Sequence, residues 1–142
     1  MSIRSKPFEL KPEHINYATT PDGKRVRVTL TLVRDGCAAP ASAEQDDLVS
    51  AVIAAINRAL ERWFDVGRVN AVPNGSILST LDGWLCRAFA YSSGGGLERG
   101  EATHTDVAKA AALAYVAAIN KLIAVLGIEA LVATDPQATQ PA

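Results

Sequence analysis

The stretch Val107–Leu126 constrains the fold more than any other part of the chain. It contains the run Ala110–Ile119, AAALAYVAAI, which carries no charge on any face, and it continues past Asn120 and Lys121 into further apolar residues. A surface helix has one apolar stripe and a charged back, whereas a helix that is apolar all round is buried. Alanine is also the strongest helix former, and its small side chain lets neighbouring backbones approach. The stretch is therefore predicted to be a central helix, or one half of an interface between subunits.

The length, net charge and cysteine content of the sequence limit the class of protein. A chain of 142 residues is one domain that can bury a core. Its net charge of −1 gives no field that favours nucleic acid or an anionic membrane. The longest uncharged part of the central helix, 110–120, is far shorter than the ~20 residues that span a bilayer. The first ten residues resemble no signal peptide, and two cysteines make no disulfide framework. We expect a cytoplasmic protein with no membrane partner.

Two strands are predicted near the N terminus. Apolar and polar residues alternate strictly from Arg25 to Leu32, which is typical of a half-buried strand. Residues 14–19 alternate as well, and the sequence Pro-Asp-Gly at 21–23 is a strong turn signal. Because an isolated hairpin is only marginally stable, we expect a third strand or a helical cover. Residues 68–72 or a second copy of the chain would supply such a strand.

The first helix is predicted near residues 43–65. Ser42 and Gln45 have the spacing of a capping box, in which side chains satisfy N–H groups that the helix leaves unpaired. Acidic residues crowd the first turn, where the helix dipole favours negative charge. Apolar residues then follow at helical spacing, and Gly67 is expected to end the helix.

A second helix is predicted to begin at Ser76, with an apolar face that runs from Ile77 to Phe89. Gly83 lies within it and costs about 1 kcal/mol relative to alanine. This suggests that another backbone passes close to this position, and the alanine-rich last helix is the natural candidate. The central helix is expected to begin with a capping box formed by Thr103 and Asp106.

Together these elements predict an α+β fold. An N-terminal antiparallel β-hairpin, with a third short strand as an option, packs on three α-helices, and the last helix is central and alanine-rich. Residues 1–13 are interpreted as an extended arm, 14–134 as a single domain, and 135–142 as a polar tail of disordered composition. We find no internal repeat, and residues 128–133 fit a last helical turn as well as a strand.

The glycine-rich segment 92–101 is the most suggestive candidate for a site. Backbone N–H groups of such loops, and the N termini of helices, bind anions. Its spacing matches neither a Walker loop nor a dinucleotide-binding loop, and a plain connection between two helices is the simpler interpretation. The candidate residues for binding a ligand or a partner are Arg87, Ser92, Ser93, Gly94, Gly95, Gly96, Arg99, Thr103 and His104.

Catalytic and metal chemistry have weaker support. Cys86, His104 and an acid such as Asp106 or Glu101 are the residue types of a nucleophilic triad. No nucleophile turn surrounds the cysteine, however, and cysteine is commonly a small buried hydrophobe. The two cysteines and two histidines lack the short spacing of structural zinc sites. We therefore predict no catalytic residue, no metal and no cofactor.

A basic strip on the predicted second strand is the candidate contact for nucleic acid. It consists of Lys24, Arg25, Arg27 and Arg34, and such residues bind phosphates. A solvated outer face of a hairpin has the same sequence pattern. Because the strip is short and the chain is net acidic, we do not expect nucleic acid as a partner.

The sequence favours a non-enzymatic interaction or assembly protein that self-associates, as a homo-oligomer, through the apolar helix. The alternative is a small binding module. It would hold an anionic, nucleotide-like ligand or a partner protein at the loop 92–101 and at the N terminus of the last helix. An enzyme of unfamiliar type has the least support.

Overall fold

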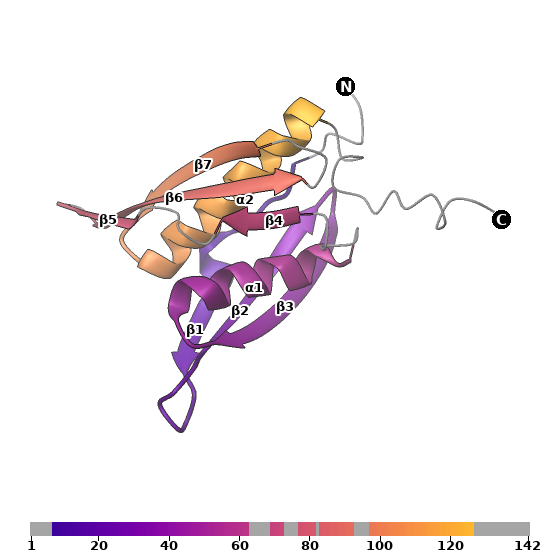
Figure 1. Cartoon of the computed structure of the whole chain (residues 1–142). Helices are drawn as coiled ribbons and strands as arrows, with labels where there is room; N and C mark the ends of the chain where they lie inside the picture. Colours follow the sequence, from indigo (N-terminus) through magenta and orange to yellow (C-terminus); the bar gives the residue numbers. More distant parts are fainter. Residues whose placement is uncertain (1–6, 63–68, 73–76, 82, 93–96, 127–142) are drawn as a thin grey trace.

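The computed structural model describes residues 7–62, 69–72, 77–81, 83–92 and 97–126. It contains two antiparallel sheets and two α-helices (Figure 1). The elements are η2 (Pro12–His14), β1 (Asn16–Thr19), β2 (Val26–Arg34), β3 (Cys37–Gln45), α1 (Leu48–Leu60), β4 (Val69–Val72), β5 (Ile77–Thr80), β6 (Gly83–Ser92), β7 (Leu97–His104) and α2 (Val107–Leu126).

The first sheet has the strand order β1-β2-β3. Its register places Tyr17 opposite Val28 and Leu30 opposite Ala41, so the apolar residues of β2 share one face. In the second sheet β6 is central, with β4 and β5 along one side of it and β7 along the other. The hairpin of β1 and β2 and the mixed α+β class are therefore as the sequence predicts.

The prediction of three helices is wrong, because the expected second helix is a pair of strands. Most of its apolar residues lie in β5 and β6, which pair with each other as a hairpin, and Leu81 lies between the two strands. Gly83 has a φ of +145°, and a Cβ there would lie 2.5 Å from the carbonyl oxygen of His104 in β7. A backbone does pass close to Gly83, as expected, but it belongs to a neighbouring strand and not to the last helix.

The third strand of the first sheet is also not the expected one. Residues 37–45 form β3 and pair with β2 along its whole length, whereas Val69–Val72 form β4 in the other sheet. Ser42 and Gln45, the expected capping box, therefore lie in a strand. The cap of α1 is Asp47, which accepts a hydrogen bond from the backbone N–H of Ser50 at 2.9 Å. Gly67 lies outside the described residues.

The two halves of the chain repeat one arrangement that the sequence did not reveal. In each half an antiparallel pair of long strands, β2 with β3 or β6 with β7, leads directly into a helix. Each helix begins after an aspartate. Asp47 caps α1, and Asp106 accepts from the backbone N–H of Ala108 at 2.9 Å at the start of α2. Thr103, the other half of the expected capping box, lies in β7.

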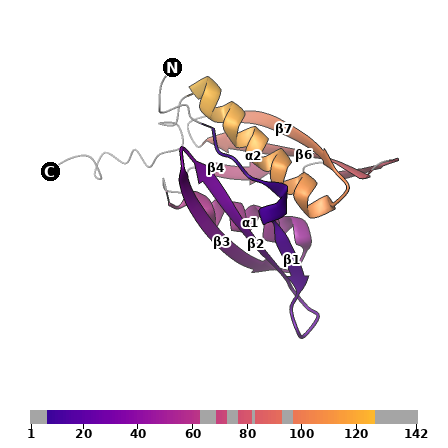
Figure 2. The same ribbon diagram turned by 180° about the vertical axis from the view of Figure 1, so that it is seen from behind.

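Each helix packs on the sheet of its own half, and the two helices contact each other. In Figure 1 α1 lies in front of β2 and β3, whereas α2 lies behind β6 and β7; Figure 2 shows the reverse side. One continuous cluster of buried hydrophobic residues joins the halves. Among the described residues, the arm, β2, β3, α1, β6 and α2 therefore contribute to a single core.

The alanine-rich helix α2 lies unusually close to its sheet. The face of β6 and β7 that it covers has only small side chains at its centre, among them Ala88, Ala90 and Gly100. A Cβ at Gly100 would collide with the backbone of Ala114 and Ala118. The alanines of α2 thus allow its backbone to lie directly on β7, which explains why this helix is built from small residues.

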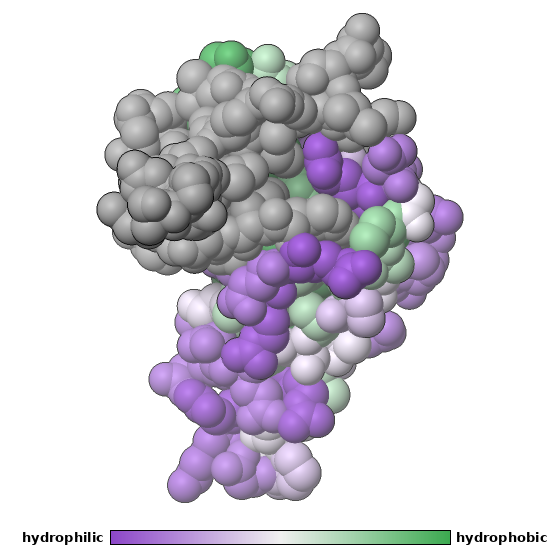
Figure 3. Space-filling model, turned by 90° about the vertical axis from the view of Figure 1, so that its right-hand side faces the viewer, coloured by the Kyte–Doolittle hydropathy of each residue, from purple (hydrophilic) through white to green (hydrophobic). Residues whose placement is uncertain are grey.

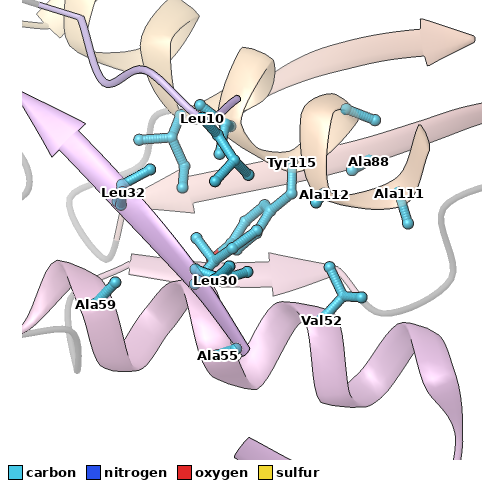
Figure 4. Packing of buried hydrophobic residues seen from close by; sticks show 14 of the residues in the cluster. Leu10, Leu30, Leu32, Val52, Ala55, Ala59, Ala88, Ala111, Ala112 and Tyr115 are labelled. Atoms are coloured by element: carbon cyan, nitrogen blue, oxygen red, sulfur yellow. The ribbon is translucent and has the colours of Figure 1, made fainter. Parts of the chain in front are cut away.

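Among the side chains whose burial is described, Tyr115 is the largest that is fully buried, and it joins the two helices. Its ring extends from α2 toward α1 beside Leu30 (Figure 4). The hydroxyl donates a hydrogen bond to the Asn57 side-chain oxygen on α1 at 2.6 Å. Burial raises the pKa of Tyr115, so its hydroxyl stays protonated and available as a donor.

The described part of the N-terminal arm is packed against the domain. Phe8 and Leu10 are buried, and Glu9 forms an isolated β-bridge with Val33. The side chain of Asn120 on α2 makes two hydrogen bonds with the backbone of Phe8, at 2.7 and 2.9 Å. Residues 1–6 and the expected tail 135–142 lie outside the described residues, as do residues 128–133.

By length and composition alone, the stretch 107–125 of α2 is able to cross a membrane. A buried core helix meets the same criterion, and 61 % of this stretch is buried within the chain. Strands β6 and β7, helix α1 and the N-terminal arm supply its contacts. One side of α2 is therefore buried in the core, whereas a stripe that includes Lys109 and Lys121 stays partly or fully exposed, so the helix is not buried on all sides.

Candidate functional site

The glycine-rich loop does not lead into a helix in this fold. Residues 93–96, which include Ser93 and the three glycines Gly94, Gly95 and Gly96, lie outside the described residues, and Ser92 is the last residue of β6. The eight residues of β7 separate the loop from α2, a distance of roughly 25 Å at the rise of an extended strand. Leu97, the first residue of β7, and His104, the last, therefore lie at opposite ends of the strand, and His104 is the one next to the N terminus of α2.

The N terminus of α2 already holds a carboxylate. One side-chain oxygen of Asp106 accepts hydrogen bonds from the backbone N–H groups of Ala108 and Lys109, at 2.9 and 3.2 Å. His104 Nδ1 accepts from the backbone N–H of Asp106 at 3.0 Å. Thr103 is exposed and, as the neighbour of His104 in a strand, points to the other face of the sheet. These contacts place His104 in the cap of the helix rather than in an open binding site.

Arg87 and Arg99 do come together, on the face of the second sheet that α2 leaves uncovered. Glu101 lies opposite Arg87 in the register of β6 and β7, and Arg87 Nε donates to Glu101 Oε2 at 2.6 Å. Arg99 Nε lies 3.8 Å from the same oxygen. We call these three residues the charged ladder. Among the predicted site residues that the structure describes, Arg87 and Arg99 are thus brought together, by a partner, Glu101, that the sequence did not suggest for this role.

A depression of about 370 Å³ lies beside the charged ladder. It is lined by Phe89, Leu97, Glu98, Arg99 and Lys121, so it joins β6 and β7 to the C-terminal half of α2. Leu97 has an exposed fraction of 57 %, which is high for a large apolar side chain. The depression thus combines one exposed apolar side chain with charges of both signs.

The outer edge of β7 distinguishes this region from the rest of the surface. Within the described ranges, β7 pairs only with β6, and it is eight residues long. The other outer strands have features that hinder pairing with another chain. Strands β1, β4 and β5 have four residues each, and β3 contains Pro40. Strand β7 is thus the long edge without a proline among the strands that the structure describes.

The basic strip that the sequence suggested does not form one surface. Arg27 donates to Glu44 on β3 with Nε at 2.8 Å, and Arg25 pairs with Asp46 at 3.5 Å. Arg34 lies over the Phe8 ring with its guanidinium carbon 5.7 Å from the centroid. In Figure 3 the lower part of the molecule, which includes the β1–β2 hairpin, is mostly hydrophilic. Acidic partners therefore offset part of the positive charge of the hairpin.

The two cysteines of the hypothetical catalytic and zinc sites lie in surroundings that do not suit those roles. Cys86 is buried in β6, and burial raises the pKa of its thiol, which disfavours the reactive thiolate. Cys37 accepts a hydrogen bond from Arg62 Nε at 3.1 Å. Over the ranges that the structure describes, no three His, Cys, Asp or Glu residues are grouped as metal ligands.

Comparison with known proteins gives no assignment. No protein-family model matches the chain, and no curated protein matches it. The charged ladder and the edge of β7 are therefore the features from which a function can be inferred.

The sequence contained a signal for β7 that is easily overlooked. The exposed residues Leu97, Arg99, Glu101 and Thr103 alternate with residues that face α2. Two of these inner residues are Gly100 and Ala102, and they lack the bulk by which a half-buried strand is normally found. Because the alternation lacks large apolar residues, the strand resembles a polar loop in sequence.

Proposed function

We propose that the chain is a non-enzymatic interaction or assembly protein that forms a homo-oligomer. The observation that carries the proposal is the outer edge of β7, a long strand with unpaired backbone groups on its outer side among the described elements. Such an edge is a template for pairing with another chain. The exposed Leu97 and the charged ladder lie along the same strand.

The apolar helix gives this proposal less support than the edge of β7 does. The residues of α2 that stay partly or fully exposed include Lys109, Leu113, Ala117, Lys121 and Val125, which follow helical spacing. Two of them are lysines, as on the solvated face of an ordinary helix. We therefore locate the self-association at the edge of β7 rather than along α2.

The proposal predicts a dimer in solution. Sedimentation velocity from about 1 to 100 µM protein, a range suited to micromolar affinity, should give a species of twice the 15.0 kDa chain mass. A Lys109→Glu variant, altered on the exposed stripe of α2, serves as the control and should dimerise like the unaltered chain. A single 15.0 kDa species at every concentration would contradict self-association.

A second candidate function is a small binding module for an anionic ligand. Its specific support is the depression at the start of β7, where Arg99 and Lys121 bring two positive charges together with one acidic residue, Glu98. A nucleotide-like ligand would place its phosphates against the two cations and its base against the exposed Leu97.

This second function predicts a rise in melting temperature with ADP at millimolar concentration, by mass action on the folded state. Lys121→Gln should remove the rise because it takes one cation from the depression. Lys109→Gln, a lysine of the same helix outside the residues that line the depression, should leave the rise intact. A flat melting curve with both ADP and inorganic phosphate would count against the binding module.

A further inference from the structure

We infer that β7 pairs with β7 of a second copy of this chain, antiparallel and related by a two-fold axis at Gly100. The inference rests on the proposed self-association and specifies its register. Each Arg99 then lies opposite the partner's Glu101, and the two second sheets join into one continuous sheet.

Strand geometry limits the registers that such a pair can have. Residues opposite each other in an antiparallel pair point to the same face, and neighbours along a strand point to opposite faces. A two-fold axis perpendicular to the sheet therefore passes midway between one residue and its own copy, which lie opposite each other. The central registers available to β7 are those with Arg99, Gly100 or Glu101 on the axis.

Charge selects one of these three registers. An axis at Arg99 places two arginines opposite each other, and an axis at Glu101 places two glutamates opposite each other, both of which are unfavourable. With the axis at Gly100, Arg99 lies opposite the partner's Glu101, and the same pair occurs a second time by symmetry. Opposite charges in directly facing positions stabilise a strand pair.

The residues around the axis fit this register in other respects. Gly100 has no side chain, and the α2 backbone at Ala114 and Ala118 lies directly beneath it, so the strand is supported at the point where two copies would meet. Leu97, with an exposed fraction of 57 %, would lie opposite the partner's Thr103 and lose exposed area. Glu101 would lie between Arg87 of its own chain, which it contacts at 2.6 Å, and the partner's Arg99.

Two charge reversals and their mixture test the register. Arg99→Glu alone would place two glutamates opposite each other, and Glu101→Arg alone would place two arginines opposite each other. Each variant should therefore dimerise about tenfold more weakly than the unaltered chain, or not at all. An equimolar mixture of the two variants restores both facing pairs between the different chains. It should form a heterodimer with nearly the original affinity.

Sedimentation velocity, with a fluorescent label on one variant, measures these affinities. Circular dichroism checks that each variant is folded. This check matters for Glu101→Arg, which also breaks the contact with Arg87; Arg99→Glu leaves that contact in place. Lys24→Glu, a charge reversal at an exposed position in the β1–β2 turn, is the control and should dimerise normally.

The outcomes separate this register from the proposed function. If the unaltered chain dimerises and both folded variants dimerise equally well, the register is wrong but self-association stands. If the single variants are monomers and their mixture stays monomeric, the register is also overturned. If the unaltered chain is itself a monomer at every concentration, both proposals fail.

Discussion

Replacement of Gly100 by alanine is expected to lower the free energy of unfolding by about 3 kcal/mol or more. The new Cβ would collide with the carbonyl oxygen of Ala114 and the amide nitrogen of Ala118, and it would lie 2.9 Å from the carbonyl carbon of Ala117. All three atoms belong to the backbone of α2, so no side chain can rotate away to make room. The helix must instead move off β7 along the whole of their contact.

Urea denaturation of Gly100→Ala and of a control variant, Gly36→Ala, tests this prediction. Gly36, in the turn between β2 and β3, has a φ of +79°, and a Cβ there meets nothing within 4 Å. Its replacement should therefore cost only the strain of a left-handed alanine, about 1–2 kcal/mol. If Gly100→Ala is no more destabilising than Gly36→Ala, then α2 does not lie on β7 as closely as the structure has it.

The parts of the fold that were predictable have large apolar residues in a regular pattern. The alternation in β2 and the helical spacing in α1 both rest on valine, leucine and isoleucine. The apolar residues of β5 and β6 misled the prediction because Ile77, Leu81, Trp84 and Leu85 also fit helical spacing. Gly83 was the discordant residue, and its positive φ near the turn between β5 and β6 explains why glycine is there.

Strand β3 was overlooked because tertiary packing outweighs its weak strand propensity. Its sequence, CAAPASAEQ, is rich in alanine and contains a proline. The buried alanines Ala39 and Ala43 lie beneath α1, where small side chains let the helix approach the sheet. One local signal did exist. Asp35-Gly36 is a strong two-residue hairpin sequence, and both residues have the positive φ of such a turn.

The candidate site was predictable only as separate residues. The sequence suggested Arg87 and Arg99, but their meeting at Glu101 depends on the register of β6 and β7. Because that register is set by long-range pairing, no local pattern indicated it. The same pairing makes a strand of Leu97–His104, where the sequence had suggested a loop followed by the cap of the last helix.

Loss of the Tyr115 side chain is the other change with a large expected effect. Tyr115→Ala should cost about 3–5 kcal/mol, because it leaves a cavity among the two helices and β2. Tyr115→Phe keeps the ring and removes the hydrogen bond of 2.6 Å to Asn57. It should cost about 1–3 kcal/mol, since the partly buried side-chain oxygen of Asn57 loses its donor. Tyr17→Phe removes a 3.1 Å bond to Asp106 at an exposed position and should change stability by about 0.5 kcal/mol or less.

The pH dependence of Tyr115→Phe separates the hydrogen bond from the packing of the ring. Burial raises the pKa of Tyr115 in the folded chain above the value of about 10 that an unfolded tyrosine has. The neutral phenol thus stabilises the fold fully below pH 10, and this contribution decreases as the pH rises above 10. Phenylalanine has no proton to lose, so the stability difference between the unaltered chain and Tyr115→Phe should shrink above pH 10. Urea denaturation at pH 8 and at pH 11 measures this change. A difference that stays constant over this range would mean that the Tyr115 hydroxyl is not buried between the helices.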